Sequence, residues 1–208
     1  NPLYFAAEGD CAEGLPTFPL SVYALGTEVK AAEGATVEMH VVKPYHNQEW
    51  DGFHSNWYTP PQEKTDEPFL AFKGQIAYCS GRIFEGYFKR SPYHLRELLR
   101  NILRRFVPNP KFKSSTLPSY ARAFVQYNKN MELLHVMVYT PELRGESVAL
   151  EERGTLADSE LSLRIDGREF KKVYLAPTRK ELAFTVADGY CKVHIPLIQG
   201  YAMIVFEK

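Results

Sequence analysis

The sequence contains few cysteines: Cys11, Cys79 and Cys191 lie far apart in the chain. They are odd in number and form no CxxC pair, so they fit neither a disulfide framework nor the ligand spacing of a zinc site. We therefore expect no disulfide scaffold, no thiol redox centre and no metal held by cysteine.

Net charge is also absent, because 25 basic residues balance 25 acidic ones. Binding to nucleic acid draws on an excess of positive charge that neutralises phosphates, so a DNA or RNA partner is not expected. No segment approaches the roughly 20 apolar residues of a membrane-spanning helix, and no basic-then-apolar leader opens the chain. We expect a soluble protein with no membrane partner.

Motifs of catalysis are missing too: the sequence has no nucleophile elbow, no HExxH, no phosphate-binding loop and no dinucleotide fingerprint. Glu151 and Glu152 are adjacent carboxylates. Neighbouring residues of a strand point to opposite faces of a sheet, so this pair could not flank one glycosidic bond. We expect the chain by itself to be non-catalytic and to need no cofactor.

What the sequence does have is material for packed cores, with 45% hydrophobic residues and 13% aromatic ones. The pattern of apolar residues changes near Pro108, which divides the chain into two parts, 1–108 and 109–208. In the first part, apolar runs bounded by glycine or proline predict strands. These runs cover residues 17–25, 35–45, 68–72 and 75–79.

One helix is predicted after these strands, with Ser91 as its N-cap and Pro92 in its first turn. Pro108 and Pro110 end it. Its apolar residues recur at helical spacing; they are Leu95, Leu98, Leu99, Ile102, Leu103 and Phe106. The polar residues predicted for the opposite, exposed face are Arg96, Glu97, Arg100, Asn101, Arg104 and Arg105. Strands followed by an amphipathic helix predict an α/β unit.

The second part consists of short strand-like runs. A hairpin is predicted over 122–141, around the turn residues Asn128-Lys129-Asn130. Further runs cover 147–152, 160–165, 170–177, 181–186, 190–197 and 201–207. About eight strands at spacings near ten residues are typical of an antiparallel β-sandwich. Alternation in "CKVHIPL" places Cys191, Val193 and Ile195 on one face.

A loop rich in aromatic residues stands between the second and third strand-like runs. It carries His46, Trp50, His54, Trp57 and Tyr58. Flat aromatic rings stack on the apolar faces of sugars, and imidazole and amide groups bond the hydroxyls between them, so these five residues are candidates for a glycan site. Trp and Tyr are also enriched at interfaces, so the same residues are candidates for contact with another subunit or domain.

A metal site in this loop would use His46, Asp51 and His54 as ligands. Their spacings of five and three residues match no compact zinc template, so no metal is assigned. The other histidines have a structural interpretation. His40 and His135, for example, lie inside strand-like runs, where a histidine is usually satisfied by a hydrogen bond.

Several stretches together resemble a family of proteins. They are "FHSNWYTPP", "PFLAFKGQIAYCSGRIFEGYFKRSPYHLRELLRNIL", "LPSYARAFVQYN", "VYLAP" and "DGYCKVHIPLIQGYAMIVFE". In this order they resemble the C-terminal half of large bacterial glycoside hydrolases, the family-42-type β-galactosidases and the family-151-type α-L-fucosidases. The resemblance runs from about residue 17 to the end. The chain departs from the family's loop at Asn56-Trp57-Tyr58, where relatives often carry polar residues or a second histidine.

In those relatives a catalytic TIM barrel precedes an amidotransferase-like α/β domain, called the trimerisation domain, and then a small β-sandwich. The resemblance therefore implies a fold that is α/β followed by all-β. Residues 1–108 would form part of a flavodoxin- or amidotransferase-like α/β unit, and 109–208 an antiparallel, immunoglobulin-like β-sandwich. The catalytic carboxylates of the family belong to the barrel, so no catalytic residue is assigned here.

The resemblance also implies a function. We expect a non-catalytic C-terminal portion of a glycoside hydrolase, which associates with the barrel domain and with other subunits of a homo-oligomer. The aromatic loop would lie at the edge of a glycan site. A bacterial protein of this kind would be cytoplasmic or periplasmic. The alternatives are a free-standing carbohydrate-binding protein and an independent glycosidase.

Overall fold

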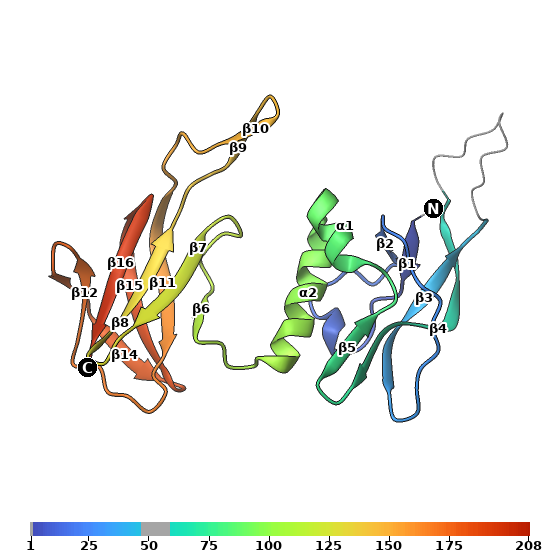
Figure 1. The fold of residues 1–208 in the computed structure, drawn as a ribbon, viewed down its shortest axis with the longest axis horizontal. Helices are drawn as coiled ribbons and strands as arrows, with labels where there is room; N and C mark the ends of the chain where they lie inside the picture. Colours follow the sequence, from blue (N-terminus) through green and yellow to red (C-terminus); the bar gives the residue numbers. More distant parts are fainter. Residues whose placement is uncertain (1, 47–58) are drawn as a thin grey trace. The chain divides into compact units, whose positions relative to one another are not determined.

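The computed structural model describes residues 2–46 and 59–208 (Figure 1). The chain divides into two compact units, one ending at Pro108 and one running from Asn109 to Lys208. Strands predominate in both, and the part described contains two α-helices. Neither helix is long and apolar enough to cross a membrane.

The first unit is built on a five-stranded sheet with the order β2-β1-β3-β4-β5. Its strands are β1 (Leu3–Phe5), β2 (Leu20–Val22), β3 (Thr36–Pro44), β4 (Pro61–Lys73) and β5 (Ile76–Cys79). Every pairing is antiparallel. A flavodoxin-like unit has a largely parallel sheet, so the α/β unit that the resemblance implies is not confirmed.

Strand β4 begins earlier than the sequence predicts. It starts at Pro61 rather than near Pro68 and pairs along its length with β3. The added residues 61–67 read "PQEKTDE" and are mostly exposed. Because neither of their faces is packed into the core, the period-2 pattern of a half-buried strand is missing there, and the segment resembles a loop.

Two helices lie on one face of this sheet (Figure 1). They are α1 (Ile83–Arg90) and α2 (Tyr93–Phe106). The α2 helix is confirmed, but α1 was not predicted, and Ser91 is not the N-cap of α2. Instead Ser91 adopts a left-handed conformation with φ 47° and caps the end of α1, donating its backbone N–H to the carbonyl of Tyr87 at 2.7 Å. Gly86 lets α1 approach its neighbours, since a Cβ there would lie 3.1 Å from Leu95.

Two polar residues of α2 are buried rather than exposed. The Asn101 side chain donates to the carbonyls of Cys11, at 2.9 Å, and Glu13, at 2.8 Å. It thereby holds the short 3-10 turn η1 (Asp10–Ala12) against the helix. Buried Glu97 forms ion pairs with Arg96 and Arg100. Helical periodicity places both residues on the polar face, and η1 contacts that face at Asn101.

The core of the first unit lies between the sheet and the helices. Phe5 and Phe69 stack with ring centroids 4.1 Å apart, and Leu95 and Leu98 of α2 are fully buried in the same cluster. Apolar residues at i and i+3 on one helix face bury against a sheet in this way because the burial removes them from water.

The second unit is an antiparallel β-sandwich. Its strands are β6 (Phe112–Ser114), β7 (Arg122–Tyr127), β8 (Met131–Met137), β9 (Glu142–Arg144), β10 (Ser147–Ala149), β11 (Thr155–Arg164), β12 (Lys172–Ala176), β13 (Lys180–Glu181), β14 (Phe184–Ala187), β15 (Tyr190–Gln199) and β16 (Tyr201–Glu207). Pairing gives a sheet β13-β12-β16-β8-β7 and a sheet β6-β11-β15-β14. They join through one pair, Gln199 and Tyr201, around Gly200 with φ 71°.

Alternating side chains from both sheets form the core of this unit. Cys191, Val193 and Ile195 of β15 are buried, and Lys192 and His194 between them are not, as the sequence predicts. They pack in one cluster with buried residues of β8, β11 and β16. The strand-rich, antiparallel character expected for the second half is confirmed.

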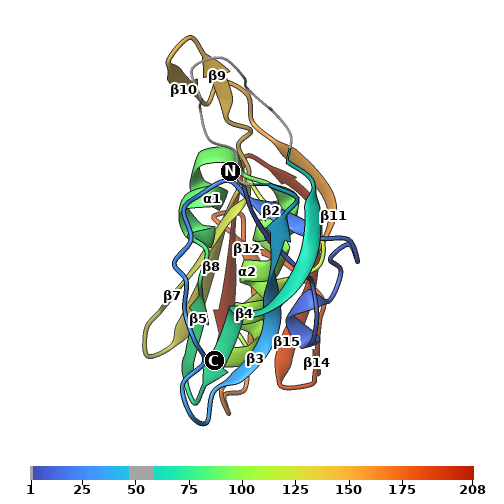
Figure 2. The same cartoon turned by 90° about the vertical axis from the view of Figure 1, so that its right-hand side faces the viewer.

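The ribbon of β9 and β10 stands apart from both sheets of the sandwich (Figure 2). Strand β10 ends at Ala149, so the run predicted over 147–152 is shorter than expected. Glu151 lies beyond the strand and pairs with Arg144 at 2.9 Å. Its carboxylate is therefore part of a surface ion pair.

One charged residue is fully buried in the sandwich. Glu132, at the start of β8, has 0% exposure and is surrounded by cations. Lys111 Nζ lies 2.7 Å from one carboxylate oxygen, Arg168 bonds the other, and Lys208 Nζ lies 3.9 Å away. The cluster joins the start of β8 to the residue just before β6, to Arg168 and to the last residue of the unit.

Candidate functional site

Most of the aromatic loop lies outside the described residues. This is true of Trp50, His54, Trp57 and Tyr58, so their proposed glycan or interface role stays a prediction. His46 lies just after β3, with its ring edge-on to Tyr45 at 5.9 Å between centroids. The two described ends of the loop are held together.

Two hydrogen bonds hold those ends. The backbone N–H of Tyr45 donates to the carbonyl of Pro60 at 2.8 Å, and the hydroxyl of Tyr4 donates to the carbonyl of Thr59 at 2.7 Å. The residues that flank the loop are thereby fixed to β1 and to the end of β3, because each bond joins segments distant in sequence.

Metal and acid–base chemistry find little support in the part of the chain that is described. No group of three or more His, Cys, Asp or Glu residues there could hold a metal ion. His40 contacts Glu8 at 3.1 Å, His94 bonds the carbonyl of Ser21 at 2.7 Å, and His194 lies 3.2 Å from Asp158. The structural interpretation of these histidines fits such contacts, since each ring nitrogen named has a fixed partner.

The three cysteines are free thiols. Burial raises the pKa of Cys11 and of Cys79 to about 12 and that of Cys191 to about 11, because a thiolate loses its hydration inside the protein. Nucleophilic catalysis needs the thiolate, so none of the three is a candidate nucleophile at neutral pH.

Cysteine alkylation tests this conclusion. Cys79 is only partly buried, so iodoacetamide can reach it, and its raised pKa should limit the rate. At pH 8 we expect it to react roughly a thousandfold more slowly than in the unfolded chain, with the rate rising about tenfold per pH unit. Mass spectrometry of the modified peptides measures the rate. Fast modification of Cys79 at neutral pH would contradict a raised pKa.

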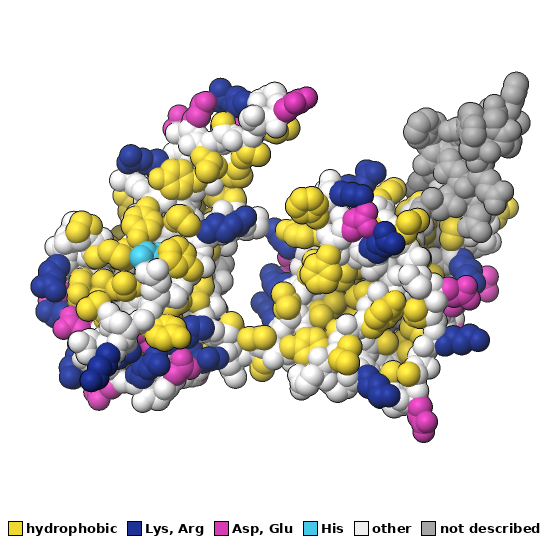
Figure 3. Space-filling model, in the orientation of Figure 1, with side chains coloured by type: hydrophobic (Ala, Val, Ile, Leu, Met, Phe, Trp, Pro, Cys, Tyr) yellow, Lys and Arg dark blue, Asp and Glu magenta, His cyan; other side chains and the backbone are white. Residues whose placement is uncertain are grey.

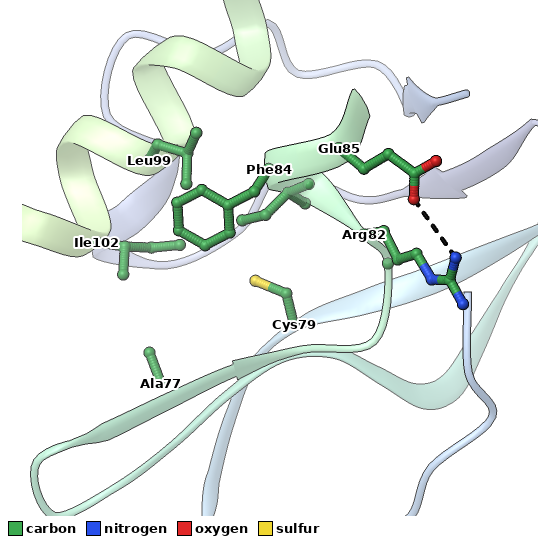
Figure 4. Close-up of a pocket in the computed structure, with 9 residues that line it drawn as sticks. Ala77, Cys79, Arg82, Phe84, Glu85, Leu99 and Ile102 are labelled. Carbon is green, nitrogen blue, oxygen red and sulfur yellow. Dashed lines mark hydrogen bonds and ion pairs between the residues drawn. The ribbon is translucent and has the colours of Figure 1, made fainter. Parts of the chain in front are cut away.

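Cys79 lines an apolar cavity of about 450 Å³ (Figure 4). We call it the β5 groove. Strand β5 forms one wall of the groove. The start of α1 and one side of α2 form the opposite wall. Its lining residues are Ala77, Cys79, Gly81, Arg82, Ile83, Phe84, Glu85, Leu99 and Ile102.

The two charged residues of the β5 groove, Arg82 and Glu85, pair with each other. Arg82 and Glu85 form an ion pair at 3.4 Å (Figure 4). Glu85 also contacts Lys89 at 2.5 Å. The hydrogen bond from Lys89 lowers the pKa of Glu85, which keeps the carboxylate ionised. An ionised, paired carboxylate is a poor general acid, so the groove is suited to binding apolar groups rather than to chemistry.

A second exposed feature lies on the outer face of the sandwich, over β7, β8 and β16. Phe124 stacks on His135 with centroids 4.4 Å apart and an interplanar angle of 5°, and the Tyr201 hydroxyl and His135 Nδ1 share a hydrogen bond of 2.6 Å. We call these three residues the aromatic cluster. Met137 and Met203 flank it in the strand register. Figure 3 shows hydrophobic side chains gathered on this unit around a histidine.

Sequence reasoning missed both features. Phe124 and Tyr201 lie in separate runs, and only the pairing of β8 with both β7 and β16 brings them to one histidine. One lining residue of the β5 groove did carry a signal, because Phe84 and Phe88 repeat at i and i+4 as on one side of a helix. That side of α1 is exposed in the structure.

Comparison with known proteins gives a match in fold. No family model matches the chain, and no curated protein matches it in sequence. Among solved structures, α-L-fucosidase isoenzyme 2 from Paenibacillus thiaminolyticus is similar over 100% of this chain, with a TM-score of 0.86 and 23% identity. The chain spans 32% of the length of that protein. It thus shares the fold of one part of a fucosidase chain.

Proposed function

We propose that this chain is a non-catalytic C-terminal portion of a glycoside hydrolase, related to α-L-fucosidases or β-galactosidases. It would serve the association of domains and subunits. The observation that carries the proposal is the fold match over the full length of the chain to 32% of a fucosidase. The first unit would be a remnant of a trimerisation-type domain and the second an accessory sandwich.

The described residues support a structural role in two ways. His40 and His94 each contact a protein partner through one ring nitrogen, and the Glu85 carboxylate is held in ion pairs. Hydrolysis of a glycoside, by contrast, needs two carboxyl groups set across a cleft. Both units also expose apolar side chains, such as Phe84 and Phe88 in one and Phe124 and Tyr201 in the other. Exposed apolar groups gathered in patches mark contact surfaces.

Enzyme assays on two proteins test the proposal. The product of the whole open reading frame that encodes this chain should hydrolyse 4-nitrophenyl α-L-fucoside or β-galactoside, and the 208 residues alone should not. A reading frame without a further domain, or hydrolysis by the 208 residues alone, would refute it. Light scattering on the whole product would show whether it is a homo-oligomer.

The aromatic cluster supports one other candidate, a free-standing carbohydrate-binding protein. Aromatic rings on a sheet can stack on sugars. Calorimetric titration of the chain with oligosaccharides decides between the two. Binding that is lost in Trp57→Ala or in Phe124→Ala would support this alternative and locate the site, and the absence of binding would leave the accessory role.

A further inference from the structure

Strand β5 leaves one edge of its sheet open. Among the described residues it pairs with β4 alone and stands at the end of the strand order. The Ser80 N–H donates to the carbonyl of Phe69. In an antiparallel pair, residues alternate between bonding the partner and pointing away from it. The backbone N–H and C=O groups of Ala77 and Cys79 therefore point to the open edge.

This edge lacks the devices by which proteins usually block further pairing. Such devices are charged side chains on the strand, proline, bulges and twisted registers. The β5 strand reads "IAYC", without a charge or a proline. Its register with β4 is regular, whereas the pairing of β3 with β4 has several irregularities. The shortness of β5 is the one protective feature it has.

Apolar surface flanks the open edge on both faces of the sheet. Ala77 and Cys79 line the β5 groove on the helix face. Ile76 and Tyr78 line a second cavity of about 290 Å³. Side chains of a strand alternate between the faces of a sheet, so a strand added at this edge would place every second side chain in each cavity.

Part of the apolar surface of the two helices is not covered by the five-stranded sheet and stays exposed. Phe84 of α1 is 72% exposed, and Leu103 of α2 is 59% exposed. Leu99 and Ile102 of α2 line the β5 groove beside them. A further strand would bring this surface into contact with apolar side chains and remove it from water.

We propose that the β5 edge binds an extended segment of a partner polypeptide as a sixth, antiparallel strand. The segment is apolar at alternate positions, to fill the β5 groove, and acidic at its ends. The acidic ends follow from the charges near the two ends of β5. Lys73 precedes the strand, and beyond it the cations Arg82 and Lys89 share the single carboxylate of Glu85, which leaves one positive charge uncompensated. Main-chain hydrogen bonds supply affinity in this mode of recognition, and the cavities supply specificity.

A second copy of this chain fits the edge less well. If two β5 strands paired antiparallel around Tyr78, Lys73 of each copy would lie opposite Ile83 of the other copy, next to its Arg82. Like charges placed across a strand pair are destabilising. The proposal concerns the sheet edge alone, and it holds whether or not the parent protein is a glycoside hydrolase.

Peptide binding to the 208-residue chain tests the proposal. The probe is the acetylated, fluorescein-labelled peptide EVTVTVE, whose valines would enter the β5 groove. We expect binding below about 1 mM by fluorescence anisotropy. We also expect slower amide hydrogen exchange at Ala77 and Cys79 when the peptide is bound, because their N–H groups become hydrogen-bonded.

Matched changes in the peptide identify the hydrogen bonds. In an antiparallel pair, a residue that exchanges hydrogen bonds with Ala77 or Cys79 has its side chain on the same face of the sheet as theirs. Because the valines would fill the groove on that face, their N–H groups point to β5. N-methylation of the three valines should weaken binding at least about tenfold. N-methylation of the two threonines should leave the affinity within about twofold, since those N–H groups point away.

Matched variants of the chain make the same comparison. Ala77→Pro removes an N–H that does not bond β4, and it should weaken binding at least about tenfold. Ala77→Ser keeps the N–H and the size of the side chain, and it should bind like the parent. Phe84→Asp, at an exposed position, should weaken binding without loss of folding, which thermal melting checks.

Four results would overturn the proposal. They are no binding at about millimolar peptide, equal binding by Ala77→Pro and Ala77→Ser, equal loss from both N-methylated peptides, and protection of Ala77 and Cys79 in a dimer that forms without peptide. If Ala77→Pro does not fold, the peptide pair and Phe84→Asp carry the test.

Discussion

Replacing Glu132 with alanine should lower the free energy of unfolding of the second unit by about 3 kcal/mol. Its carboxylate is fully buried and has Lys111 at 2.7 Å, Arg168 and Lys208 around it. Removing the anion leaves these cations beside one another without compensation. The loss falls at the lower end of the range for a broken buried pair, because Lys111 and Arg168 keep partial contact with water.

The matched control is Glu142→Ala, which removes an exposed carboxylate paired with Arg144 at 3.1 Å. Exposed ion pairs contribute about 0–1 kcal/mol, so this variant should unfold like the parent. Urea denaturation, followed by hydrogen exchange of peptides from residues 109–208, measures both. If Glu132→Ala were as stable as the control, the buried cluster would not stabilise the sandwich.

Replacing Phe5 with alanine should lower the free energy of unfolding of the first unit by about 3–5 kcal/mol. Phe5 has 0% exposure, and its ring stacks on Phe69 at 4.1 Å with an interplanar angle of 3°. The substitution removes the transfer free energy of the ring and leaves a cavity between the sheet and α2. It also removes the stacked contact.

Phe18→Ala is the control for this substitution, because Phe18 is 64% exposed. A surface substitution of this kind changes stability by about 0.5 kcal/mol or less. Hydrogen exchange of peptides from the first unit distinguishes its unfolding from that of the second. Equal effects at the two phenylalanines would show that Phe5 does not pack in the core.

Local periodicity determined the elements that could be predicted. The α2 helix has apolar residues every three to four positions, and the strands of the second half alternate, as β15 does around Val193. Neighbouring residues carry both signals, so no distant contact is needed to read them. The α1 helix was missed because it has eight residues, too few for a clear period, and carries Gly86 in its middle.

Buried polar residues were predicted less well, and for two different reasons. Glu132 lies in phase with the buried Leu134 and Val136 of β8, so alternation gave a signal for it. Asn101 and Glu97 of α2 gave none. The burial of Asn101 involves η1, a segment about 90 residues away in sequence, as its bond to Cys11 shows.

The candidate sites also divide into one that the local sequence indicates and one that depends on distant contacts. The aromatic loop was found from composition alone, and His46 is the one of its five candidates that lies among the described residues. The β5 groove was not found, because it joins Cys79 to Leu99 and Ile102, which come together only when α2 packs on the sheet.

By itself, the sequence determined the amphipathic helix, the strand-rich second half and the absence of catalytic motifs, since each follows from residue type and near spacing. Only the tertiary structure decided that the sheet of the first unit is antiparallel, that β5 is its open edge and that Glu97, Asn101 and Glu132 are buried. These features depend on which distant segments pack together, and packing is settled by the apolar area that the whole chain removes from water.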